Sequence, residues 1–333
     1  MRLKEIDILR VICILLVVAD HSFALFSGHW KNSYGLPDIR AYFWIGRFAS
    51  CFMLPLFVFI SGYVFSWQIN VVQKKYSFWI LFKKKASRLL IPCYSFGFLY
   101  ILLFSSFNDW INIKGILLFF SGVEHLWFLP MLFWCFLFAL LLIRAQYNSY
   151  MVLTVLAFVN IFTIETSSFG LLHALYYLFY FYLGYIIFQN KEEVVTKIMP
   201  KLPYLIVCFL ILFPICTKYI SCFELIETSS LCNRFLLQWQ IHCFRFLPAF
   251  LGVLISYLIA LKINNEPYSK LVNCSMGIYL LHYFIIICLL SQLSVTAYVG
   301  VYALPFLLMF VSYFGSLLLT ELLIRTKLGK SIL

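Results

Sequence analysis

Charged residues are scarce in this sequence. Only 11% of its 333 residues are Asp, Glu, Lys or Arg, whereas 64% are hydrophobic and 20% are aromatic. Water-soluble domains carry about 25% charged residues, so this composition excludes such a domain and makes the bilayer the solvent. A spanning helix needs about 20 apolar residues, and this length therefore accommodates roughly ten spans and no separate soluble domain. We predict an all-α polytopic membrane bundle in which residues 1–333 form one domain.

Apolar runs separated by polar residues or by Pro and Gly define the predicted spans. The run 150–164 is short for a full span, and the segment before Trp127 is expected to be irregular or a half-helix. The ten candidate spans are 8–27, 43–66, 89–107, 117–143, 150–164, 170–189, 202–220, 241–261, 271–291 and 300–323.

Basic residues outnumber acidic ones by 25 to 13, which gives a net charge of +12. They gather in short loops, as in Lys74-Lys75 and Lys83-Lys84-Lys85. Most fall on one side of the membrane if the N-terminus is cytoplasmic, so we predict that both termini are cytoplasmic. No aromatic and basic surface domain accompanies the charge, so the expected partner is membrane lipid and not nucleic acid.

The cysteines do not indicate a disulfide framework or a metal site. Of the eleven, most lie inside apolar runs, where packed thiols are expected. Cys222 and Cys232, in one predicted polar loop, are the only pair for which a disulfide is plausible. No spacing is typical of a metal site, so no metal is expected.

Several ionisable residues lie inside the first predicted span, where each costs about 2.5–3.5 kcal/mol in hydrocarbon and so suggests a function. At about 100° per residue, Asp7, Arg10 and His21 form one polar stripe. Arg10 and His21 are three turns, or about 16 Å, apart along the helix. This spacing suits a donor whose phosphates bind a cation at the inner face while a long arm carries a thioester inward, as in coenzyme A. Histidine takes a proton from a hydroxyl at neutral pH, which suits the deep position.

The same residues allow simpler interpretations. His21 bonds a backbone carbonyl and Arg10 extends to lipid headgroups in the structural alternative, and spacing alone does not decide between the two. Asp20 points away from His21, and a pairing with Arg47 on the second span is a possible arrangement because opposite charges are less costly together. The basic cluster 83–88 binds either phosphates or anionic lipid.

Five short motifs, in order, resemble the membrane acyltransferase-3 family. Arg10 is followed eleven residues later by His21, and the second span contains Pro-Leu-Phe-Val-Phe-Ile-Ser-Gly-Tyr at 55–63. The others are Arg-Leu-Leu-Ile-Pro at 88–92, His-Leu-Trp-Phe-Leu at 125–129 and Gly-Ile-Tyr-Leu-Leu-His at 277–282. Each motif is weak alone, but together they cover nearly the whole chain.

The resemblance implies a ten-helix enzyme of the bacterial inner membrane that transfers an acyl group, commonly acetyl, from acyl-CoA to an extracytoplasmic acceptor such as a cell-surface glycan. O-acetylation of a polysaccharide is thus the expected modification. The resemblance assigns His21 as the catalytic histidine and Arg10 as its companion near the donor. The family's Arg-x-x-Arg before the third span reads Lys85-Ala86-Ser87-Arg88 here. Lysine retains the charge but lacks the bidentate fork of arginine.

These observations give a set of predicted site residues. His21 acts as general base or carries the acyl group, while Arg10, Arg88 and Lys85 bind the phosphates of the donor. His125 and Trp127 contact the acceptor sugar in one interpretation and belong to the interfacial aromatic belt in the other.

Further histidines and the second-span motif receive weaker assignments. Tyr279 and His282 are weaker candidates for the cavity wall. We expect packing roles for 61–63, and structural or interfacial roles for His29, His173 and His242. The rival function is an exporter of a polysaccharide or lipid-linked intermediate, which needs no thioester site.

Overall fold

The computed structural model is a bundle of helices. It describes residues 3–27, 35–105, 110, 112–164, 169–224, 226, 230–263, 265, 267–327 and 329, and these contain no β-strand. The α-helices are α1 Lys4–Ser27, α2 Arg40–Asn70, α3 Phe78–Lys85, α4 Ile91–Phe104, α5 Ile113–Ser121, α6 Phe128–Arg144, α7 Ser149–Phe162, α8 Leu171–Gln189, α9 Lys191–Glu193, α10 Leu202–Glu224, α11 Leu231–Lys262, α12 Ser269–Ile287 and α13 Leu304–Arg325.

Three π-helical turns join or extend neighbouring helices. They are Ala86–Leu90 between α3 and α4, Val194–Ile198 between α9 and α10, and Cys288–Gln292 after α12. The first two turns make long continuous spans of Phe78–Phe104 and Lys191–Glu224. A π-helical turn shifts the register of the side chains that follow it and is common at functional sites.

Nine helices in the described part of the chain are long and apolar enough to cross a membrane. The all-α membrane architecture is therefore confirmed. The fifth predicted span, 150–164, is the 14-residue helix α7, which is too short to be counted among these nine. Several spans are longer than predicted, because polar residues at their ends extend the helices beyond the apolar runs. An example is α11, which begins at Leu231 where the prediction begins at 241.

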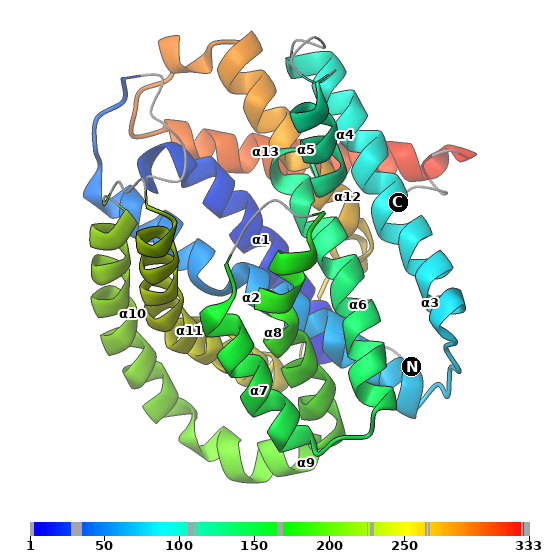
Figure 1. Ribbon diagram of the computed structural model, residues 1–333. Coiled ribbons are helices and arrows are strands. Elements are labelled where there is room, and N and C mark those ends of the chain that lie inside the picture. The colour runs from blue at the N-terminus through cyan, green and yellow to red at the C-terminus, as the bar shows by residue number, and fades with distance from the viewer. Residues whose placement is uncertain are drawn as a thin grey trace.

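The helices α1 and α2 lie in the middle of the bundle (Figure 1). Helix α2 packs against α1, α8 and α11, and α1 also packs against α12 and α13. The pair α10 and α11 lies at one edge of the view, and α3 and α4 lie at the opposite edge. Two long helices thus pass through the centre of the molecule, and several polar residues on them, such as Asp7, Asp20 and Arg47, are buried in protein.

Glycines permit the closest of these contacts. A Cβ atom on Gly62 of α2 would overlap the backbone carbonyl of Phe181 in α8, and one on Gly184 of α8 would overlap the carbonyl of Phe59. Small residues allow helix backbones to approach in this way in membranes. The predicted packing role of Gly62 is confirmed, and Tyr63 beside it is fully buried and donates a hydrogen bond to Glu5 (2.8 Å).

The cysteines are all free thiols. Cys222 lies in α10 and Cys232 lies in α11, and both are exposed. The suggested disulfide between them and their placement in one polar loop are therefore wrong. The helices extend into a segment that has too few apolar residues to be recognised as a span.

Candidate active site

The polar stripe predicted on the first span faces the protein interior. Asp7 is 8% exposed and pairs with Arg10, with 3.6 Å between the guanidinium and the carboxylate. His21, three turns further along α1, is half-buried and contacts the ring of His282. Arg10 at one end of the stripe and His21 at the other line two different cavities.

The Nδ1 atom of His21 lies 2.9 Å from the carbonyl oxygen of Val17, one turn earlier in α1. This is the backbone hydrogen bond of the structural alternative, and it accounts for only one ring nitrogen. A neutral imidazole that donates from Nδ1 has its lone pair on Nε2. The bond therefore selects the tautomer in which Nε2 is the basic atom, which is the form that a general base requires.

Three histidines from three segments form a cluster. Nε2 of His282, in α12, lies 3.3 Å from Nδ1 of His21. Nδ1 of His282 lies 2.9 Å from the carbonyl oxygen of Ile278, so Nε2 is the accepting atom toward His21. The ring of His125 lies 5.2 Å from that of His282 and 6.1 Å from that of His21, measured between centroids.

His125 lies in a 3-10 turn between α5 and α6, Glu124–Trp127. Gly122 (φ 96°) and Glu124 (φ 48°) adopt positive φ angles and interrupt the helix here. The predicted irregularity before Trp127 is confirmed. The break frees the carbonyl of His125 from a regular α-helical hydrogen bond, and this carbonyl accepts a bond from the hydroxyl of Tyr279 (2.5 Å).

Tyr283 and Glu124 hold the ring of His125. Tyr283 stacks on the imidazole at 4.7 Å and donates a hydrogen bond to a carboxylate oxygen of Glu124 (2.8 Å). His125 itself is 6% exposed, and neither ring nitrogen has a hydrogen-bond partner within the described residues. A buried imidazole without a hydrogen-bond partner is costly, so this ring is a candidate for an interaction with a ligand.

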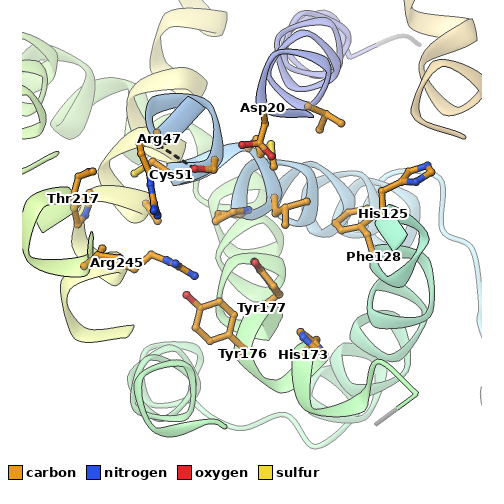
Figure 2. Close-up of a pocket in the computed structure, with 18 of the residues that line it drawn as sticks. Asp20, Arg47, Cys51, His125, Phe128, His173, Tyr176, Tyr177, Thr217 and Arg245 are labelled. Atoms are coloured by element: carbon orange, nitrogen blue, oxygen red, sulfur yellow. Dashed lines mark hydrogen bonds between the residues drawn. The ribbon is translucent and has the colours of Figure 1, made fainter. Parts of the chain in front are cut away.

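The histidine cavity, which we define by His21 and His125 in its wall, has a volume of about 270 Å³. Figure 2 shows Arg47, Thr217 and Arg245 on one side of it and His125 and Phe128 on the other. Its remaining polar and aromatic lining includes Asp20, Ser50, Trp127, His173, Tyr176, Tyr177 and Tyr279. Hydroxyls and aromatic faces together suit a sugar, whose hydroxyls need hydrogen bonds and whose apolar face stacks on rings.

The basic cavity, which we define by Arg10, Lys85 and Arg88 in its wall, has a volume of about 390 Å³. Arg88 follows Lys85 across the π-helical turn, and the ammonium of Lys85 lies 3.3 Å from the centroid of the Phe136 ring. Neutral polar side chains also line it, namely Ser61, Gln68, Asn273 and Ser275. Three cations with amide and hydroxyl groups nearby provide suitable contacts for an anion attached to a polar arm.

The two cavities meet at two side chains. Phe128 and Tyr279 are the residues that line both of them among the residues described. The predicted site residues thus divide into two groups, with Arg10, Lys85 and Arg88 on one side of this pair and His21, His125 and Trp127 on the other.

Arg47 is not held as the sequence suggested. Its guanidinium forms two hydrogen bonds with Glu224 at the end of α10 (3.1 and 2.5 Å), so the suggested pairing with Asp20 is wrong. Arg245 of α11 lies 3.6 Å from the same carboxylate. Asp20 is 6% exposed and lines the histidine cavity separately.

Sequence reasoning underrated four residues of the site. His282 and Tyr279, which were weak candidates, contact the cluster directly, and their spacing of three residues on one helix was a usable signal. His173 lines the histidine cavity against Trp127 at 4.9 Å, and Arg245 lines it from α11. His242 is buried against Tyr176, and His29 lies outside the described residues.

Comparison with known proteins identifies the family. The sequence matches the family model Acyl_transf_3, described as an acyltransferase domain, over residues 3–325. No curated protein and no solved structure matches the chain. The match spans nearly the whole of a chain that folds as a multi-pass bundle, and every helix listed above lies within the matched domain. The chain therefore belongs to the acyltransferase 3 family and is a membrane-embedded acyltransferase.

Proposed function

We propose that this acyltransferase moves an acyl group, acetyl in the first instance, from acyl-CoA to a hydroxyl of a cell-surface glycan or a related extracytoplasmic acceptor. One observation carries the proposal. The basic cavity is lined by three cations, and the histidine cavity is lined by His21, His125 and His173. Within the described structure the two cavities meet at only two side chains, Phe128 and Tyr279. A donor with charged phosphates and a reactive end on a long arm fits this arrangement.

The basic cavity is the proposed site of the donor. Arg10 and Arg88 offer planar forks that match phosphate oxygens, and Lys85 offers a compact charge. The partly exposed Arg10 side chain, at 36%, remains accessible to a ligand. We place this cavity on the cytoplasmic side, with both termini cytoplasmic, because acyl-CoA is a cytoplasmic metabolite and the basic loops indicate that orientation.

His21 is the proposed general base. Its Nε2 lone pair accepts the proton of the acceptor hydroxyl as the oxygen forms a bond to the thioester carbonyl carbon. The carbon–sulfur bond then breaks, and the thiolate of coenzyme A leaves and takes up the proton held by the imidazolium. Nδ1–H remains hydrogen-bonded to Val17 and His282, which stabilises the transient positive charge.

A covalent route through an acyl-histidine uses the same atoms. In that route Nε2 attacks the thioester first, and the hydroxyl displaces the acyl group in a second step. Incubation of the protein with acetyl-CoA alone separates the routes, because only the covalent one leaves acetyl on His21 in the peptide mass spectrum.

The histidine cavity is the proposed site of the acceptor. His125 offers two buried ring nitrogens without protein partners in the described chain, and Trp127 and Tyr177 offer aromatic faces. A sugar ring in this cavity places a hydroxyl beside His21. The glycan reaches the cavity from the outer face of a bacterial inner membrane in this proposal.

Two measurements test the proposal. Glycan mass analysis of cells with and without the gene should show a loss of one acyl unit per sugar, which identifies reaction, acyl group and acceptor together. Binding of acetyl-CoA to purified protein should weaken about tenfold or more in Arg10→Ala, since a charge-assisted contact contributes about 1.5–3 kcal/mol.

One control lies outside both cavities, and a second variant removes the proposed base. Arg325→Ala, at the exposed end of α13, should leave donor binding unchanged. His21→Ala should retain donor binding and lose glycan acylation. Donor binding that survives Arg10→Ala, or a protein that binds no acetyl-CoA yet exports glycan, refutes the enzyme assignment in favour of an exporter.

A further inference from the structure

Two aromatic side chains separate the basic cavity from the histidine cavity. The rings of Phe128 and Tyr279 lie 5.8 Å apart between centroids, and each side chain is 5% exposed. Phe128 begins α6 and Tyr279 lies in the middle of α12, so the pair closes the passage from two sides. The neighbouring ring of Phe57, on the basic side, lies 5.8 Å from Phe128 and supports it.

The position of Tyr279 is fixed at both ends. Its hydroxyl donates a hydrogen bond to the carbonyl of His125 (2.5 Å), and its ring contacts the rings of His125 and Phe128. Phe128 directly follows the 3-10 turn that carries His125. The separation between the cavities is therefore held by the same turn that supplies a histidine to the reaction site.

The connectivity of an acyl thioester determines which of its atoms pass this pair. The phosphates are at one end, the sulfur follows the long arm, and the acyl chain is the last part. If the phosphates bind the cations of the basic cavity and the carbonyl reaches His21, the acyl chain lies beyond Phe128 and Tyr279. It then occupies part of the 270 Å³ histidine cavity, which the acceptor must also enter.

We propose that Phe128 and Tyr279 determine the length of the acyl chain that this enzyme accepts, and that they restrict it to short chains such as acetyl. The inference rests on the proposed acyl-CoA donor and adds to it the residues that select among donors. Close-packed aromatic rings tolerate added methylene groups poorly, because the rings or the backbone must move to make room.

The test is the binding of non-hydrolysable ketone analogues of acetyl-, butyryl- and hexanoyl-CoA to the full-length protein in lipid nanodiscs. Coenzyme A without an acyl group provides the reference affinity. The wild-type protein should bind the hexanoyl analogue about tenfold or more weakly than the acetyl analogue, since a pocket distinguishes a single methylene by about 10–200-fold. In Phe128→Ala, this ratio should fall to within about twofold, because the side chain that excludes the longer chain is gone.

A matched variant separates this effect from general loosening. Leu132→Ala removes a buried side chain that lines only the basic cavity, one turn after Phe128, and should keep the wild-type ratio. Phe128→Leu is a milder replacement that keeps the site filled, and its ratio should lie between those of the wild type and Phe128→Ala. It also serves as the test variant if the alanine protein does not fold.

The outcomes distinguish the two proposals. Equal binding of all three analogues to the wild type, or an equal change in Phe128→Ala and Leu132→Ala, overturns the role of the aromatic pair while the donor assignment stands. Absence of binding of every analogue and of coenzyme A overturns the donor assignment, and this inference falls with it.

Discussion

His282 provides the most specific prediction about the chemistry, because it contacts the proposed base and no other group in the described chain is bonded to its Nε2. That nitrogen lies 3.3 Å from Nδ1 of His21 and accepts a hydrogen bond from the Nδ1–H group. In the transition state the ring of His21 becomes an imidazolium, and a hydrogen bond to a charged group contributes about 1.5–3 kcal/mol. The distance between the two nitrogens is long, and the Nδ1–H group of His21 also donates to the carbonyl of Val17. We therefore take the lower limit of this energy range.

A loss of about 1.5 kcal/mol corresponds to about a tenfold decrease in kcat for His282→Leu. The KM for acetyl-CoA should not change, because His282 does not line the basic cavity. His282→Gln should recover most of the rate, since the amide oxygen accepts a hydrogen bond near the position of Nε2. The assay is the release of free coenzyme A thiol from acetyl-CoA, with envelope glycan from a strain that lacks the gene as acceptor.

The comparison of the two variants decides the argument. A wild-type kcat in His282→Leu shows that Val17 alone orients the base. An equal loss in the leucine and glutamine variants shows that His282 acts through packing, and the hydrogen-bond argument is then refuted. A rise in the KM for the donor in either variant contradicts the separation of the two cavities.

Two further predictions concern stability. Gly62→Val should lower the thermal unfolding temperature in detergent, because the new side chain overlaps the carbonyl of Phe181 and the separation of α2 from α8 costs about 1–3 kcal/mol; unchanged melting would contradict the close approach. Arg47→Ala should cost about 2 kcal/mol, below the usual range for a buried pair because a third of the Glu224 side chain is exposed. The double variant Arg47→Ala/Glu224→Ala should recover part of this loss in the same melting experiment, and a further decrease would show that the pair is not the cause.

The polar stripe of α1 was predictable because its residues belong to one helix. The α-helical repeat fixes the relative directions of Asp7, Arg10 and His21 wherever the helix lies. The burial of the stripe follows as well, since charges are costly against lipid. The short motifs pointed to Lys85, Arg88 and His125 as further site residues. These three residues line the same two cavities as Arg10 and His21.

The contacts between helices were not predictable from a single sequence. His282 meets His21 across 261 positions of the chain, and Arg47 meets Glu224 across 177. Both contacts depend on which helices are neighbours, and hydropathy contains no information on that choice. Charge suggested Asp20 as the nearest partner for Arg47, whereas the structure brings the end of α10 closer.

Helix ends were also missed for a physical reason. An apolar run measures only the part of a helix that lies in hydrocarbon, whereas α10 and α11 continue with polar residues beyond it. The two cysteines assigned to a loop lie in these extensions. Hydrogen bonding within a helix does not stop at the membrane surface, so the spans are longer than their apolar cores.

The short helix α7 has a consequence for the surrounding lipid. Its 14 residues extend about 21 Å, whereas the hydrocarbon of a bilayer is about 30 Å thick. Helix α7 packs against α8 and α11, two helices that wall the histidine cavity. In the proposed orientation we expect the missing length to fall on the outer side. A hydrophobic mismatch of this kind should thin the outer leaflet there and bring the aqueous phase closer to the proposed acceptor site. A cysteine placed at Phe162, in a variant whose four exposed native cysteines are replaced by serine, should accordingly react with a membrane-impermeant thiol reagent added from outside. A cysteine that stays shielded at that depth would rule out the thinning.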